Sequence, residues 1–221
     1  MTSIGFYAFR DCSNLTAVYI TDLAAWCRIN FDYIYSNPLY YSHHLYLNGE
    51  EIKDLVVPNT VTSISGYAFY ACSGLTTVSI PNGVTSLDRY AFCGCSALTS
   101  ITVQGSAIDI GGGVFENCTS LTDFYCYAEE APESLYVVFN STPVKTATLH
   151  VPASAIDDYR FTAPWYAFGS IVPLEGDGIN SVDVHVKDDV TPWYTLDGRT
   201  LNGKPATKGI YVRGGKKVLV K

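Results

Sequence analysis

Apolar side chains recur at a fixed interval through the middle of the chain. Phe69, Phe92 and Phe115 repeat with a constant period of 23. The same step relates three cysteines and three leucines, which are Cys72, Cys95, Cys118, Leu75, Leu98 and Leu121. Repetition with a period of this length is the sequence signature of a solenoid, in which each unit contacts only its neighbours. The pattern therefore predicts a repeat solenoid that works through an extended surface.

Polar and apolar positions within one unit predict its local structure. Residues 77–80 alternate between hydroxyl and apolar side chains, which is the period of two of a half-buried strand. Residues 69–75 carry phenylalanine, cysteine and leucine at intervals of three, which favours a tight helical turn over a long α-helix. A second short strand is expected over 84–87, after a turn at 81–83. Each unit is thus predicted to contain two short strands and a tight helical turn.

The beginning of the chain matches this array only with an interruption. Residues 2–15 repeat the block that begins at Thr62, but the displacement from Thr2 to Thr62 is not a multiple of the period of the array. We therefore expect an insertion within about residues 22–54. Because Met1 lies directly on a repeat, with no polar cap before Ile4, the first face of the array is expected to be exposed or to pair with another copy.

The pattern changes towards the C-terminus. Residues 128–175 are interpreted as a degenerate last repeat and a cap, with Ser154 placed to cap a short helix over 155–160. The bulky groups expected to close the last open face are Trp165, Tyr166, Phe168 and Ile171. Residues 1–175 are therefore assigned to the solenoid.

A small all-β segment is predicted over residues 176–221, after a polar linker at 175–178. Residues 210–212 and 217–220 are apolar-rich runs joined through a glycine pair at 214–215, which is a hairpin signal. A segment of this size is marginal as an independent domain.

Composition and charge narrow the class of protein. The chain has 221 residues, of which 48% are hydrophobic and 16% charged, so it can bury a continuous core. No run of residues is long and apolar enough to predict a membrane span. The net charge is -7, with -10 in residues 1–176 and +3 in residues 177–221. An acidic solenoid argues against nucleic acid as a partner, because phosphates require a basic face.

The cysteines and histidines are candidates for chemical sites. Cys12 shares one repeat position with the three cysteines of the array, which indicates a ladder of buried thiols. Parallel strands lie ~4.8 Å apart, so one oxidised pair remains an alternative. His43 and His44 offer two metal ligands, but adjacent histidines in a tyrosine-rich loop are more often packing residues. Gly111 to Gly113 is interpreted as a turn of the repeat, not a phosphate loop. We expect no catalytic, cofactor-binding or metal-binding residues.

Two groups of residues are candidates for binding a partner. One is a row of outward strand hydroxyls, namely Thr77, Ser79, Ser100 and Thr102. The other is the tyrosines of the insertion, chiefly Tyr33, Tyr35, Tyr40 and Tyr41, because tyrosine contributes contact area at low entropic cost. The alternative for the first group is that Ser and Thr are ordinary solvent-facing strand residues. For the second group the alternative is a structural brace, and the exposure of the rings separates the two interpretations.

The repeat resembles a known family. The segment Ile64-Ser65-Gly66-Tyr67-Ala68-Phe69, followed by Cys72, Leu75, Val78 and Ile80-Pro81, is similar to the leucine-rich repeats of BspA-like surface proteins, over about residues 1–175. The resemblance implies a leucine-rich-repeat-like stack that is exported to the bacterial cell surface. It also implies adhesion to host matrix or plasma proteins, or to another bacterial surface protein or glycan.

The C-terminal segment has a second resemblance. Residues 194–199, Tyr-Thr-Leu-Asp-Gly-Arg, and residues 208–212, Lys-Gly-Ile-Tyr-Val, are similar to the C-terminal sorting domains of proteins exported by the type IX route. This resemblance also implies an extracellular or outer-surface location.

The expected function is therefore that of a non-enzymatic adhesin or interaction platform. The first alternative is a structural or self-assembling module of the cell envelope that associates through its uncapped N-terminal repeat. A carbohydrate-active enzyme would need two carboxylates that converge in a cleft, and the sequence shows no pattern for them.

Overall fold

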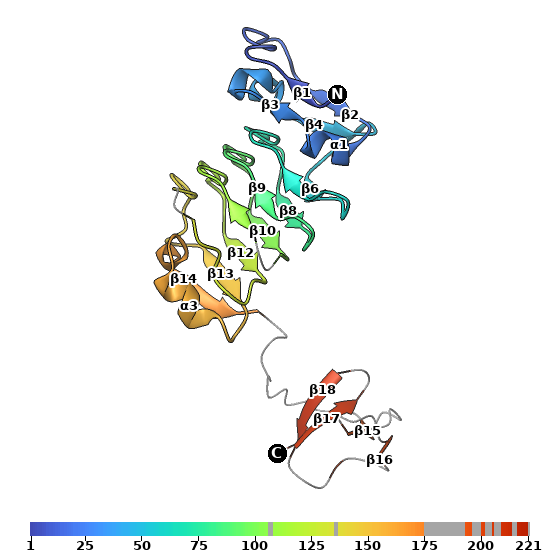
Figure 1. Ribbon diagram of the computed structural model, residues 1–221, viewed down its shortest axis with the longest axis vertical. Helices are drawn as coiled ribbons and strands as arrows, with labels where there is room; N and C mark the ends of the chain where they lie inside the picture. Colours follow the sequence, from blue (N-terminus) through green and yellow to red (C-terminus); the bar gives the residue numbers. More distant parts are fainter. Residues whose placement is uncertain are drawn as a thin grey trace. The chain divides into compact units, whose positions relative to one another are not determined.

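The chain folds into two compact units, Met1–Leu174 and Glu175–Lys221 (Figure 1). The structure is a computed structural model. It describes residues 1–105, 108–134, 137–174, 193–195, 200–201, 205, 209–213 and 216–220. The predicted linker at 175–178, the turn at 214–215 and most of residues 194–199 lie outside the described residues.

The first unit is built around a parallel sheet of six strands in the order β14-β13-β12-β10-β8-β6. Their bounds are β6 (Asp54–Val56), β8 (Thr77–Ile80), β10 (Ser100–Val103), β12 (Asp123–Cys126), β13 (Thr148–Val151) and β14 (Ser170–Pro173). Asp54, Thr77, Ser100 and Asp123 are successive register partners. A second parallel sheet contains β7 (Ser63–Ile64), β9 (Ser86–Leu87) and β11 (Asp109–Ile110). The chain therefore winds in coils, as in a leucine-rich-repeat solenoid, and the coils that contain β6, β8 and β10 each add one strand to both sheets.

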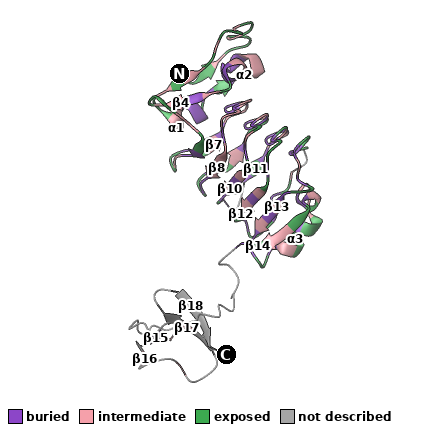
Figure 2. Ribbon diagram, turned by 180° about the vertical axis from the view of Figure 1, so that it is seen from behind, coloured by how far each residue is buried: buried purple, intermediate pink, exposed green. Residues whose placement is uncertain are grey.

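Each strand of the large sheet is half-buried. In β8, Val78 and Ile80 are buried whereas Thr77 and Ser79 are only partly covered, and β10, β12 and β13 repeat this alternation. Consecutive tight turns, each closed by a hydrogen bond between residues three apart, connect the two sheets. Cys72 N donates to Phe69 O at 3.1 Å, and Leu75 N donates to Cys72 O at 3.3 Å. Figure 2 shows the buried residues along the strands and exposed residues in the loops.

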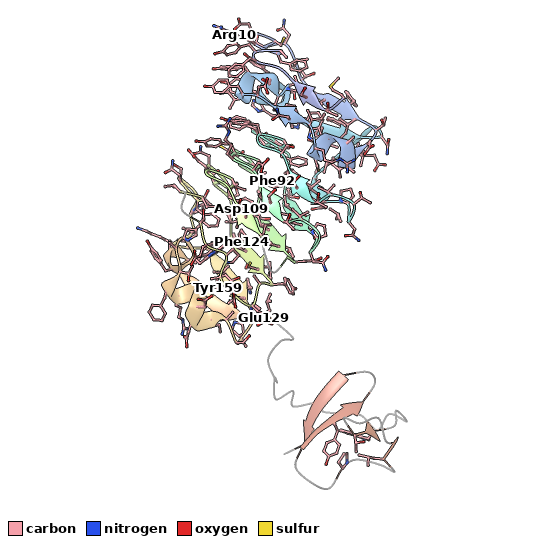
Figure 3. The ribbon with its side chains drawn as sticks, viewed as in Figure 1. Arg10, Phe92, Asp109, Phe124, Glu129 and Tyr159 are labelled. Carbon is pink, nitrogen blue, oxygen red and sulfur yellow. The ribbon has the colours of Figure 1, made fainter. Side chains whose placement is uncertain are left out.

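A file of stacked phenylalanines fills the interior. The rings of Phe69 and Phe92 are 5.1 Å apart and nearly parallel, and Phe115 continues the file 5.8 Å beyond Phe92. Phe139 extends it by a further 5.8 Å, and Phe124 meets Phe115 edge-on. Figure 3 labels Phe92 and Phe124 among these side chains. The coils therefore share one continuous core.

Buried thiols form a second ladder beside the rings. Cys95 Sγ donates to Phe69 O at 3.2 Å, and Cys118 Sγ donates to Phe92 O at 3.4 Å. Burial raises the pKa of the Cys72 and Cys118 thiols to about 12. All seven cysteines are free, so the disulfide alternative is not adopted here.

One turn position in the first coil and in three coils of the regular array has a left-handed backbone. Tyr7, Tyr67 and Tyr90 have φ of 58°, 62° and 58°, and Gly113 occupies the equivalent position with φ of 66°. A Cβ at Gly113 would overlap the ring of Tyr90. The glycine run at 111–113 therefore belongs to the turn of the repeat. The absence of a side chain at Gly113 leaves room for the ring of Tyr90 in the preceding coil.

The segment 22–54, predicted as an insertion, contains a coil of its own. β1 (Ser3–Ile4) pairs in parallel with β3 (Asn30–Phe31), and β2 (Val18–Ile20) pairs in parallel with β4 (Leu45–Leu47). The additional elements are α1 (Leu23–Cys27), the 3₁₀ helix η1 (Ile34–Ser36), α2 (Leu39–Ser42) and β5 (Glu50–Glu51). The coil escapes detection in the sequence because it lacks the Phe-Cys-Leu spacing of its neighbours.

Side chains attach this coil to the regular array. Trp26 Nε1 donates to Ala68 O at 2.9 Å, and Asn37 Nδ2 donates to Tyr67 O at 2.6 Å. Within the array, backbone amides make the corresponding bonds, such as Phe69 N to Ala91 O at 2.8 Å. Indole and amide groups thus supplement the backbone bonds at this junction, where Ser65 N still donates to Cys27 O at 2.9 Å.

The interior of the first coil is only partly covered. Ile4, Phe9, Cys12 and Leu15 are half-buried, whereas Ile64, Phe69, Cys72 and Leu75 are fully buried two coils later. These four side chains are therefore less covered than their counterparts in the regular array.

The last face is closed by α3 (Ile156–Phe161) and the 3₁₀ helix η2 (Trp165–Ala167). Tyr159 and Trp165 are fully buried, and Trp165 Nε1 donates to Pro132 O at 2.7 Å.

Two expectations about this end of the solenoid were wrong. Ser154 does not cap the helix, because Ala155 occupies the cap position and Ser154 Oγ donates to Glu129 Oε2 at 2.6 Å. Tyr166 does not help to close the face, since it is 62% exposed.

The second unit contains an antiparallel sheet in the order β16-β15-β17-β18. Its strands are β15 (Trp193–Tyr194), β16 (Thr200–Leu201), β17 (Gly209–Arg213) and β18 (Lys216–Val220). β17 and β18 pair along their whole length, and Trp193 is buried.

Removing one ring from the phenylalanine file should destabilise the solenoid. Phe92→Ala is expected to lower the free energy of unfolding by about 3–5 kcal/mol, because it leaves a cavity between two neighbouring rings. Urea unfolding followed by circular dichroism measures this loss. The matched variant Phe161→Ala, at a side chain that is 85% exposed, should stay within about 0.5 kcal/mol of the parent. Equal effects of the two substitutions would contradict the shared core.

Candidate interaction surface

The outward face of the six-stranded sheet is a flat surface of two side-chain rows. The first row is Asp54, Thr77, Ser100, Asp123, Thr148 and Ser170, and the second is Val56, Ser79, Thr102, Tyr125, His150 and Val172. Every member of both rows is exposed or half-buried. The structure brings together the four hydroxyl residues predicted from the sequence, since Thr77 pairs with Ser100 and Ser79 with Thr102.

Several hydroxyls near this face serve the coil stack itself. Thr76, Thr99 and Thr122 each donate Oγ1 to the carbonyl of the preceding coil, at 3.0, 3.1 and 3.1 Å. Thr77 Oγ1 donates to Asp54 Oδ1 at 2.8 Å. These four threonines therefore have a structural role, which for Thr77 agrees with the alternative to partner binding.

Three of the predicted hydroxyls do not take part in that ladder. Within the residues that the structure describes, no protein group hydrogen-bonds the side chains of Ser79, Ser100 or Thr102. All three are half-buried on neighbouring strands. Their donors and acceptors are directed at solvent, where a bound partner can use them.

A polar and aromatic cluster that sequence reasoning missed lies beside them. His150 Nε2 donates to Asp123 Oδ1 at 2.9 Å, and the imidazole stacks on the ring of Tyr125 at 4.2 Å and 11°. The hydrogen bond from His150 is the main cause that lowers the pKa of the Asp123 carboxyl, and burial opposes it. Tyr125 and His150 are register partners on β12 and β13. The strand alternation of both segments was the available signal for this cluster.

A second aromatic pair occupies the outward face of the N-terminal coils. Tyr19 on β2 and Tyr46 on β4 are register partners whose rings stack at 4.8 Å. Tyr19 is 69% exposed. Aromatic pairs therefore stand on the strand faces of both the first and the later coils.

The predicted tyrosines of residues 22–54 form a different cluster, in the turns that follow the short strands. Tyr35 contacts Tyr33 at 5.7 Å and Tyr40 at 4.7 Å, and Tyr40 contacts Tyr41 at 4.8 Å. The cluster continues to Tyr70 of the array, which stacks on Tyr40 at 6.1 Å. The structure therefore brings these four tyrosines together, but on the turns, not on the sheet face with Thr77, Ser79, Ser100 and Thr102.

Exposure divides this turn cluster into two parts. Tyr35, Tyr40 and Tyr41 are half-buried, and Tyr41 Oη accepts a bond from Asp11 N at 2.9 Å, which is the behaviour of a brace. Tyr33 stacks instead on Phe6, which is 62% exposed, at 5.6 Å. Arg10, labelled in Figure 3, lies over the ring of the half-exposed Tyr7 at 5.1 Å. The outer part of the cluster is an exposed aromatic patch, the inner part a structural support.

The histidine pair has structural contacts. His43 Nδ1 lies 3.0 Å from Ala71 O, and His44 Nδ1 lies 2.6 Å from Glu51 Oε1. Across the described part of the chain, no three histidine, cysteine or acidic side chains are grouped as a metal would need. The described helices also include none with the length and apolar character to cross a membrane.

The hydrogen bond between Asp123 and His150 should make the free energy of unfolding depend on pH. A lowered native pKa means that the ionised carboxyl stabilises the fold above its ordinary pKa, and that this contribution disappears as the pH falls through the native pKa. His150→Gln is expected to cost at most about 1 kcal/mol at pH 7, because the Asp123 side chain is 37% exposed. Urea unfolding at pH 7 and about pH 2.5 should show that this difference shrinks in acid. A difference that grows in acid would contradict the assignment.

Comparison with known proteins agrees with the coil architecture. A family model described as the BspA type leucine rich repeat region matches six copies, over residues 1–37 and 40–164. The crystal structure of a leucine-rich repeat protein from Eubacterium ventriosum is similar, with a TM-score of 0.49 and 19% identity over 78% of this chain. The chain spans about half of that protein, 52% of its length. No curated protein sequence matches. Because the family model covers most of the sequence, the chain belongs to the BspA-type leucine-rich-repeat family.

Proposed function

We propose that this protein is an exported bacterial surface protein that binds other macromolecules through the outward face of its six-stranded sheet. Its role is that of an adhesin for host matrix or plasma proteins, or for another bacterial surface. The observation that carries the proposal is the group of uncommitted hydroxyls of Ser79, Ser100 and Thr102 beside the stacked pair Tyr125 and His150. Binding through this face requires no catalytic group, so the proposed role is not that of an enzyme.

The physical properties of the face suit broad recognition. Parallel pairing holds its side chains at fixed positions on adjacent strands, so little conformational entropy is lost when a partner binds. Tyr125 supplies the kind of side chain that dominates binding energy in protein interfaces. The surrounding hydroxyls can form the polar contacts of a wet interface.

Export and surface location rest on family membership and on the C-terminal resemblance. Proteins with BspA-type repeats are typically associated with bacterial surfaces, and residues 194–199 and 208–212 resemble a type IX sorting segment. Only part of that segment is described by the structure, so its sorting role is a proposal from sequence.

A structural role in the cell envelope is the second candidate. It is favoured by the partly exposed interior of the first coil, where Ile4, Phe9 and Leu15 are half-buried. β1 and β2 each pair on one side only among the described strands. A second copy that stacks on this coil would extend both sheets. A mass that rises with concentration in light scattering would favour self-assembly over adhesion.

Large charged side chains on the sheet face should prevent capture of a protein partner. The double variant Ser79→Arg/Thr102→Arg is expected to reduce saturable binding to immobilised matrix and plasma proteins at least tenfold, which corresponds to about 1.4 kcal/mol. Surface plasmon resonance on fibrinogen and on a soluble matrix extract provides the measurement.

The control carries the same chemistry elsewhere. Thr60→Arg adds arginine at an exposed turn between β6 and β7 and should bind like the parent. Unchanged capture by the double variant, together with loss in Phe6→Ser/Tyr33→Ser, would move recognition to the exposed aromatic patch of the turns. Unchanged capture by both, or no capture by the parent, would reject the adhesin proposal.

A further inference from the structure

The sheet face contains one site where an aromatic ring, a carboxylate and free hydroxyls converge. Tyr125 on β12 and His150 on β13 stack on each other. Asp123, two residues before Tyr125 on the same face of β12, accepts the hydrogen bond from the imidazole. A carboxylate has about four acceptor positions, of which His150 occupies one. The remaining acceptors are available, because the side chain is 37% exposed.

The neighbouring strand adds the hydroxyls. Ser100 is the register partner of Asp123, and Thr102 is the register partner of Tyr125. Partners on adjacent strands are ~4.8 Å apart, so one bound group can contact the carboxylate, the ring and a hydroxyl at the same time. Neither hydroxyl has a protein partner among the described residues.

We propose that this cluster binds an uncharged, β-linked polysaccharide; the inference rests on the proposed function and adds a ligand class to the same face. A pyranose ring has a face of C–H groups and a rim of hydroxyls. The C–H face carries slight positive charge and packs against the negative face of an aromatic ring. The rim hydroxyls donate to a carboxylate such as Asp123 and exchange hydrogen bonds with Ser100 and Thr102.

The spacing of the strands favours a repeating sugar over a peptide. Across β13, β12, β10 and β8 the second row presents His150, Tyr125, Thr102 and Ser79 at successive steps of one strand spacing. A β-linked pyranose unit is about as long as that step, so a glycan that crosses the strands places one sugar over each coil. An extended peptide advances ~3.3 Å per residue and falls out of register with the coils.

Charge selects an uncharged glycan. Both rows lack lysine and arginine, and they carry Asp54 and Asp123. Residues 1–176 together carry a net charge of -10. Sulfated or uronic-acid polysaccharides would be repelled by this face.

Isothermal titration of the full chain with hexasaccharides tests the proposal. The probes are cellohexaose, chitohexaose and xylohexaose, with a heparin-derived hexasaccharide as the anionic comparison. Saturable binding of at least one uncharged probe is expected, with affinity that rises from the disaccharide to the tetrasaccharide. No binding of any uncharged probe, or equal binding of the anionic probe, would overturn the proposal.

Matched tyrosine variants locate the site. Tyr125→Ala should weaken binding at least tenfold, and Tyr166→Ala, at an exposed tyrosine of η2, should leave it unchanged. Thr102→Arg covers the same position without removing the ring, so it reports on the site even if Tyr125→Ala unfolds. Binding that survives Thr102→Arg would overturn the assignment.

Failure of this inference is distinguishable from failure of the proposed function. Capture of fibrinogen or matrix protein that depends on the sheet face, without binding of any hexasaccharide, would leave the adhesin role in place and reject the glycan site. Loss of both activities in the parent would reject the two together.

Discussion

The structure depends on one constraint. A single coil cannot pair its own strand backbone or cover its own core side chains. The coils that contain β6, β8 and β10 have one short strand in each sheet, and the backbone groups along those strands find their partners in the coil before or after. Phe92 and Phe115 likewise stack between the rings of the coils on either side. Order in one coil therefore requires order in the next, and the surface that results is as regular as the ladder beneath it. The binding face is a product of this same repetition.

Sequence reasoning works well where this constraint acts most strictly. Phe69, Phe92 and Phe115 must meet in one file, so their spacing is visible in the amino-acid sequence and the parallel sheets follow from it. The coil within residues 22–54 was missed because its pairing to the first coil does not keep the period of the array. It also bonds to the array through the side chains of Trp26 and Asn37 in addition to the backbone. Because this coil is irregular, its residues do not repeat the spacing of the array, and the sequence pattern does not reveal it.

The site was harder to predict than the fold, for a related reason. Thr77, Ser79, Ser100 and Thr102 are assigned to one face by strand alternation alone, and the structure places them there. Tyr125 and His150 belong to coils that differ in length, so their separation along the chain departs from the period of the repeat and the two do not align in it. Which hydroxyls are free and which support the ladder depends on hydrogen bonds between coils, and a single coil's sequence contains no information on them.

The junction at Trp26 and Asn37 has a consequence for how such an array changes over time. Joints between regular coils are made mainly by main-chain groups, which nearly every amino acid possesses, so coils can be duplicated, lost or exchanged there with little regard to identity. The joint to the N-terminal coils keeps a main-chain bond from Ser65 N to Cys27 O, and it adds an indole and a carboxamide that reach two particular carbonyls. Regular coils can therefore be added on the C-terminal side of this junction during evolution, while Trp26 and Asn37 must be inherited together.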